Sequence, residues 1–282
     1  MKINGGTLFQ LFKYTVYALL SFNVYLFFVQ EYTAAQLQFP GGIRTGELIE
    51  AYAATIDTLA WVILLLMFEL ETYVLEDRHF TRSVTWTLHT LRAFCYVFII
   101  YAFYGYIQNL IFIYAAAPLP DINNLCVLVT EQWSYATALD EYVRITVENC
   151  GTLSSTDAFH RFAGMAAVVD TGGLTNIRNL AWVDVINAAV WLFVVLILEV
   201  DVQLQERNRF EGLVLKLSNA FKIVLYSALL LAAIYWGARG DFVDFWDAML
   251  WLIAFVLIEL NVFEWRQESL EQAATQATAE TG

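Results

Sequence analysis

A Trp and a Glu that stand eight residues apart, with only apolar residues between them, occur three times in this chain of 282 residues. The three pairs are Trp61 and Glu69, Trp191 and Glu199, and Trp251 and Glu259. Each pair lies within a long apolar run. Self-similarity of this kind indicates repeated structural units. The spacing therefore predicts one membrane helix that is present in three copies.

Six apolar stretches have about the length that a helix needs to cross a hydrocarbon core of roughly 30 Å. Hydrophobic residues make up 59% of the chain and charged residues only 15%, which is unlike a soluble domain of this length. The stretches lie near residues 12–30, 52–72, 93–115, 180–202, 220–237 and 242–262. We therefore expect an all-α membrane protein with six transmembrane helices.

The first, third and fifth stretches share a second repeat, in which a cation is followed by Tyr four residues later. The pairs are Lys13 and Tyr17, Arg92 and Tyr96, and Lys222 and Tyr226. Each of these stretches precedes one that carries the Trp and Glu pair. The sequence thus predicts three repeated two-helix hairpins, with an insertion between the third and fourth spans.

The distribution of Lys and Arg predicts the orientation, because these residues concentrate on the cytoplasmic side of membrane proteins. Most of the Lys and Arg residues fall on one side if that side holds the N-terminus, the C-terminal tail and the two connectors that follow the second and fourth spans. We expect an inner (plasma) membrane protein with both termini in the cytoplasm. The expected units are 1–115 (first hairpin and third span), 116–179 (acidic insertion outside the cytoplasm), 180–266 (spans four to six) and 267–282 (cytoplasmic tail).

Two of the three cysteines, Cys126 and Cys150, lie in the insertion. Outside the cytoplasm such a pair favours a disulfide, and no cluster of His or Cys accompanies it that would indicate a metal site. The insertion is also acidic. This charge is consistent with a cap that attracts cations, or with a loop that charge keeps soluble.

A polar residue precedes each repeated Trp by four positions: Asp57, Asn187 and Asp247. These residues stand about 18 Å from the repeated Glu along a helix, well inside the membrane. An ionised carboxylate there costs on the order of 3 kcal/mol unless it faces water or a partner. The three residues are expected either to line a polar path for a cation or a proton, or to hydrogen-bond between helices. An enzyme is not expected, because all three His residues fall outside the spans and no nucleophile with a base is evident.

The repeated Glu residues are expected to leave the membrane at the depth where the repeated cations enter it. Each hairpin is therefore expected to form an ion pair at its cytoplasmic end. The residues concerned are the cations Lys13, Arg92 and Lys222 and the acids Glu69, Glu199 and Glu259.

These features predict a channel or transport protein for a cation or a small cationic solute. The alternative is a scaffold that transports nothing, or an accessory subunit of a larger membrane complex. Gly105 is the only glycine well inside a span, and every Pro lies in a predicted loop, so the broken helices of rocking carriers are not indicated. The expected partners are the lipid bilayer, a cation, and further copies or other membrane subunits. No cofactor, metal or nucleic acid is expected.

Overall fold

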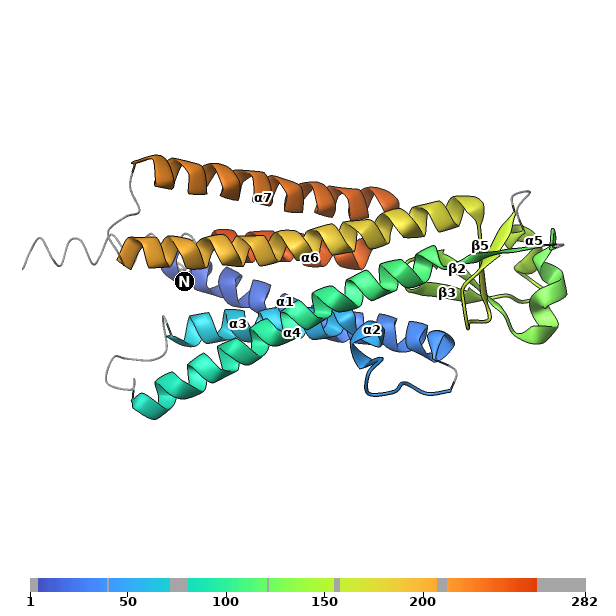
Figure 1. Ribbon diagram of the computed structural model, residues 1–282, viewed down its shortest axis with the longest axis horizontal. Coiled ribbons are helices and arrows are strands. Elements are labelled where there is room, and N and C mark those ends of the chain that lie inside the picture. The colour runs from blue at the N-terminus through green and yellow to red at the C-terminus, as the bar shows by residue number, and fades with distance from the viewer. Residues whose placement is uncertain are drawn as a thin grey trace, which may run out of the picture.

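The computed structural model describes residues 5–39, 41–71, 81–120, 122–154, 158–206 and 212–257. Long helices form an elongated bundle, and a small sheet lies at one end of it (Figure 1). Four helices are long and apolar enough to cross a membrane, as expected of a membrane protein. They are α1 (Gly5–Gln38), α4 (Arg82–Tyr114), α6 (Thr171–Glu206) and α7 (Gly212–Arg239).

Two further helices coincide with the other predicted spans. Helix α3 (Ala53–Glu69) has 17 residues and follows the single turn α2 (Leu48–Ala51). The second helix covers residues 242–257, where the described part of the chain ends. Both are shorter than the ~20 residues that usually cross a bilayer. By this measure four helices, rather than the predicted six, qualify as spans within the described ranges.

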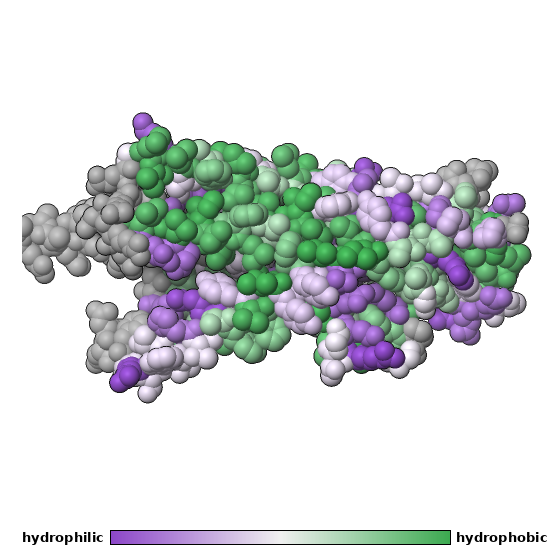
Figure 2. All heavy atoms as spheres, in the orientation of Figure 1, coloured by the Kyte–Doolittle hydropathy of each residue, from purple (hydrophilic) through white to green (hydrophobic). Residues whose placement is uncertain are grey.

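The long helices begin and end at opposite ends of the bundle. The starts of α1, α4 and α7 and the ends of α3 and α6 lie at the end away from the sheet (Figure 1). Helix α4 extends beyond the predicted span because Thr81 caps it, with its hydroxyl accepting a hydrogen bond from the Val84 N–H at 3.4 Å. Apolar side chains cover the face formed by α6 and α7, as lipid-facing helices require (Figure 2).

The insertion folds as a five-stranded mixed sheet, so the all-α prediction is wrong for this part of the chain. The strand order is β1-β4-β5-β2-β3, with β2 parallel to β5 and the other neighbours antiparallel. The strands are β1 (Ala117–Leu119), β2 (Ser134–Ala138), β3 (Glu141–Arg144), β4 (Phe159–Arg161) and β5 (Ala167–Asp170). Strands of three to five residues give too short an alternation of polar and apolar side chains to predict them from sequence.

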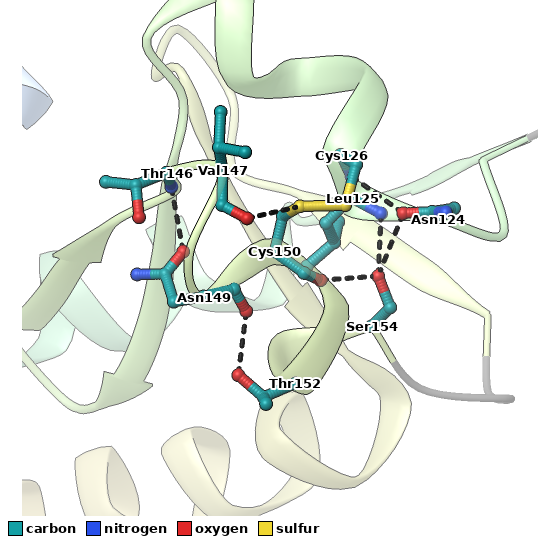
Figure 3. The surroundings of a disulfide bond; sticks show 9 residues. All are labelled: Asn124, Leu125, Cys126, Thr146, Val147, Asn149, Cys150, Thr152 and Ser154. Carbon is teal, nitrogen blue, oxygen red and sulfur yellow. Dashed lines mark hydrogen bonds between the residues drawn. A yellow bond between two sulfur atoms is a disulfide. The ribbon is translucent and has the colours of Figure 1, made fainter.

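The predicted disulfide is confirmed. Cys126 in the short helix η3 (Leu125–Glu131) is bonded to Cys150, the first residue of α5 (Cys150–Leu153) (Figure 3). The Ser154 hydroxyl ties the two segments together: it accepts from the Leu125 N–H at 2.8 Å and donates to the Cys150 carbonyl at 2.7 Å. The apolar core of the domain lies against this crosslink and includes Phe159 and Val168, both fully buried.

Candidate functional site

The three repeated tryptophans meet in the middle of the bundle. Trp61 comes from α3, Trp191 from α6 and Trp251 from the helix of residues 242–257. Their ring centroids are 5.8, 6.2 and 6.5 Å apart, within the range of favourable aromatic contact. We call these three residues the tryptophan cluster. Each pair of rings is tilted or edge-on, so that the three indoles pack against one another.

A cavity of about 50 Å³ lies next to the tryptophan cluster, and we call it the central cavity. All three residues predicted to line a polar path are on its wall: Asp57, Asn187 and Asp247. The three helices that carry them run away from the sheet. The tryptophan cluster, four residues further along each helix, therefore lies about 6 Å further from the sheet than these polar side chains.

Two aspartates that were not predicted also line the central cavity. Asp184 and Asp244 each lie one helical turn closer to the sheet than Asn187 and Asp247. The Trp236 indole N–H donates to Asp184 Oδ1 at 3.2 Å. The same spacing of 60 residues relates Asp184 to Asp244 and Asn187 to Asp247, which is a sequence signal. The repeated Asp was not predicted because the equivalent position in the first repeat is Ala54.

The predicted path residues also bond to neighbouring helices. Asn23 on α1 donates from Nδ2 to Asp247 Oδ1 at 2.7 Å, and Tyr106 on α4 donates to Asp57 Oδ2 at 3.4 Å. Within α3, the Trp61 indole N–H donates to Asp57 Oδ1 at 3.0 Å. The two predicted alternatives, lining a polar path and hydrogen bonding between helices, therefore both apply to Asp57 and Asp247.

A second cavity, of about 40 Å³, lies toward the sheet, and we call it the sheet-side cavity. Its walls include Glu31 of α1, Glu50 of α2 and Asp140 of the turn between β2 and β3. The two cavities share five wall residues: Phe27, Ala54, Tyr106, Asp184 and Asp244. Together they form a polar interior that leads from the sheet domain to the tryptophan cluster.

Glu31 has a structural role at this point. Its carboxylate accepts from the Ala54 N–H at 2.7 Å, the Thr55 N–H at 3.0 Å and the Thr55 hydroxyl at 2.5 Å. The N–H groups of the first helical turn have no partner within the helix. Glu31 therefore caps the start of α3 from another helix.

The turn between β2 and β3 joins the sheet domain to the bundle. Leu139 is buried among helix residues that include Ala233 and Trp236. Asp140 has a φ of 58°, a left-handed conformation that Asp and Asn tolerate better than most residues. Burial, followed by the charges of Asp241 and Glu141, raises the pKa of Asp140 to about 6.

This pKa predicts a loss of stability as the pH rises. An unfolded Asp has a pKa of about 3.9. Because the folded protein holds the proton more tightly, the stabilisation is complete below that value and is lost as the pH rises through about 6. Asp140→Asn should therefore reduce the change in unfolding free energy between low and high pH by roughly 1–3 kcal/mol. Unfolding temperatures of both proteins at pH 5 and pH 8 measure it, with the exposed Glu148→Gln as control. Equal pH dependence in all three proteins would contradict the prediction.

The ion pairs at the end away from the sheet agree only in part with the prediction. Lys13 Nζ lies 2.6 Å from Glu69 Oε1, as expected, and both side chains are buried. Tyr14 and Tyr17 also donate to this carboxylate, at 3.1 and 3.4 Å. The expected pairing of Arg92 with Glu199 is wrong.

The cations of the second and third units pair instead with the acid that lies two residues beyond the repeated Glu of the preceding unit. Arg92 Nη2 contacts both carboxylate oxygens of Glu71, at 2.9 and 2.7 Å, and Lys222 Nζ lies 2.8 Å from Asp201 Oδ2. Glu199 is exposed and, among the described residues, accepts a hydrogen bond from Gln203 at 3.5 Å. Glu259 lies outside the described residues. These two pairs join the end of one predicted hairpin to the start of the next.

Comparison with known proteins adds nothing to this geometry: no family model matches the chain, and neither curated proteins nor solved structures give a significant match. The described residues also contain no group of three His, Cys, Asp or Glu side chains placed to hold a metal ion.

Proposed function

We propose that this protein lets a cation pass through the membrane along the polar interior between the tryptophan cluster and the sheet domain. The observation that carries this proposal is that Asp57, Asn187 and Asp247, from three separate helices, line one cavity. Asp184 and Asp244 add two more carboxyl groups to its wall. Acidic walls in a low-dielectric interior attract cations and repel anions.

The proposed architecture has six spans arranged as three hairpins around this interior, with α3 and the helix of residues 242–257 as the second and sixth. The contact among Trp61, Trp191 and Trp251 supports it, because equivalent residues of three repeats meet where a threefold arrangement would bring them together. The proposed orientation places both termini in the cytoplasm and the sheet domain outside it. The arrangement of the helix ends in Figure 1 is consistent with this orientation.

In this proposal the tryptophan cluster closes the path toward the cytoplasm. Packed indole rings leave no polar group for a cation to contact, so a cation in the central cavity has to wait until these rings separate. The ion pairs at the cytoplasmic end, such as Lys13 with Glu69, hold the helices in register below this closure.

The test is cation flux into liposomes that contain the purified protein. Asp57→Asn with Asp247→Asn preserves size and most hydrogen bonding but removes two groups that can ionise beside a passing cation. A unit charge at 4 Å is worth roughly 4 kcal/mol at an effective dielectric constant of 20. We therefore expect flux to fall by at least about tenfold, since each factor of ten needs only about 1.4 kcal/mol.

The matched control is Glu148→Gln, an exposed acid of the sheet domain that should leave flux unchanged. Leu at positions 57 and 247 should instead destabilise the bundle, by roughly 1–3 kcal/mol at each position, because partner groups lose their acceptor. Unchanged flux in the double Asn variant, together with unfolding of the Leu variant, would reject transport. It would leave a scaffold or an accessory subunit as the better interpretation.

A further inference from the structure

The walls of both cavities carry carboxyl groups. None of the described residues on either wall is Lys, Arg or His. The central cavity is lined by Asp57, Asp184, Asp244 and Asp247. An ionised carboxylate without a partner costs several kcal/mol in such an interior, and it takes up a proton instead. Glu31, on the wall of the sheet-side cavity, differs in that two N–H groups at the start of α3 donate to its carboxyl group.

The site is also short of hydrogen-bond donors, which is an independent observation. Asn23 is completely buried and its Nδ2 reaches Asp247 on the cavity wall, yet its Oδ1 accepts no hydrogen bond from the described residues. Asn187 Oδ1, on the wall of the central cavity, is likewise shielded and accepts none. Both oxygens need an O–H or N–H donor. A protonated carboxyl group or a water supplies one.

Tyr106 connects the two cavities. It is on the wall of both, and its hydroxyl donates to Asp57 Oδ2 at 3.4 Å. The cavities measure about 50 and 40 Å³, and one water needs roughly 10–15 Å³ of such volume. Each cavity is therefore large enough for a few waters. A hydroxyl that both donates and accepts, placed between two small hydrated spaces, is suited to pass a proton from one to the other.

Accepting the proposed function, we infer that the cation moved through this interior is the proton, and that Tyr106 passes it between the two cavities. Asp57 is protonated at rest and first gives its proton to a water of the central cavity. In the central step the Tyr106 O–H bond then breaks as its proton bonds to the Asp57 carboxylate. At the same time the Tyr106 oxygen takes a proton from a hydronium ion that has entered the sheet-side cavity, which leaves a neutral water there and restores the phenol. Asp57 is thereby protonated again, and one proton has moved from the sheet-side cavity to the central cavity with no other reactant.

Tyr106→Phe tests this inference, because Phe fills the same space without the hydroxyl. Liposomes containing a pH-sensitive dye report proton entry under an imposed membrane potential, and parallel samples report Na⁺ and K⁺ entry. We expect proton flux with the unsubstituted protein and a loss of at least about tenfold with Tyr106→Phe, the factor that corresponds to about 1.4 kcal/mol. Tyr104→Phe, an exposed position two residues earlier on α4, should leave the flux unchanged.

The outcomes separate this inference from the proposed function. Flux of Na⁺ or K⁺ without proton flux overturns the inference and leaves cation passage standing, whereas the absence of any flux rejects cation passage itself. Full proton flux in a folded Tyr106→Phe protein overturns the role of Tyr106. Infrared spectroscopy adds a readout that does not depend on transport: at neutral pH the C=O stretch of protonated carboxyl groups should be present and should weaken in the variant with Asn at positions 57 and 247. Its absence would overturn the inference.

Discussion

Replacing Lys13 with Met is expected to destabilise the protein by about 3–5 kcal/mol, because it leaves the charge of Glu69 buried without its partner. The two side chains are 3% and 6% exposed, and Nζ lies 2.6 Å from Oε1. The hydroxyl groups of Tyr14 and Tyr17 are neutral donors and do not replace the lost cation. Denaturant titration of the purified protein gives the change in the free energy of unfolding.

Two further variants decide whether the effect comes from the buried charge. Lys216→Met makes the same substitution at an exposed position of α7 and should change stability little. Adding Glu69→Gln to Lys13→Met removes the unpaired charge but keeps an oxygen acceptor for the two tyrosines. The double variant should therefore recover most of the lost stability. If Lys13→Met is no less stable than Lys216→Met, the ion pair does not hold α1 to α3.

Replacing Gly105 with Val is the second substitution expected to have a large effect, because α4 passes very close to the junction of α2 and α3 at this residue. A Cβ atom at Gly105 would stand 2.7 Å from the Ile49 carbonyl oxygen and 3.0 Å from Ala53 Cβ. Backbone has to move to make room, and overpacking of this kind costs typically 1–3 kcal/mol and occasionally more. The unfolding temperature should fall accordingly.

Gly151→Val provides the comparison, because a Cβ atom at Gly151 has nothing within 4 Å. The intrinsic cost of Val in a helix is less than about 1 kcal/mol, so this variant should be close to the unsubstituted protein. Equal effects of the two substitutions would mean that α4 does not depend on close contact at Gly105. A larger effect at Gly105, accompanied by reduced cation flux, would connect this contact to the shape of the cavities.

The sequence predicted those features that depend on composition and on position along a helix. The apolar runs indicated a membrane protein, the repeated spacing identified the residues that line the central cavity, and two cysteines in an insertion indicated a disulfide. It did not predict which sides of the helices face one another. Glu69 is the last residue of α3 and Glu71 comes two residues later. On a continued ideal α-helix the two would lie at nearly the same depth but about 200° apart, so spacing alone does not select the partner of Arg92.

The rest of the site depends on contacts between segments that are far apart in the chain. In the sequence, Tyr106 cannot be distinguished from the other aromatic residues of its span, because its contact with Asp57 depends on how α4 packs against α3. Glu31 acquires its role only when the start of α3 lies beside it. Asp140 belongs to an insertion whose short strands pair across gaps of several tens of residues, and its neighbour Asp241 follows α7. No local pattern records such contacts.

The insertion of a folded sheet between two packed helices raises the question of how the helices stay together. Strand β1 begins three residues after α4 ends, and β5 runs directly into α6. Only β4 lies between these two strands. Two strand spacings of about 4.8 Å make roughly 10 Å, which is the distance at which two helices pack. The sheet thus acts as a spacer of matching width, and separating α4 from α6 at this end means breaking strand hydrogen bonds first.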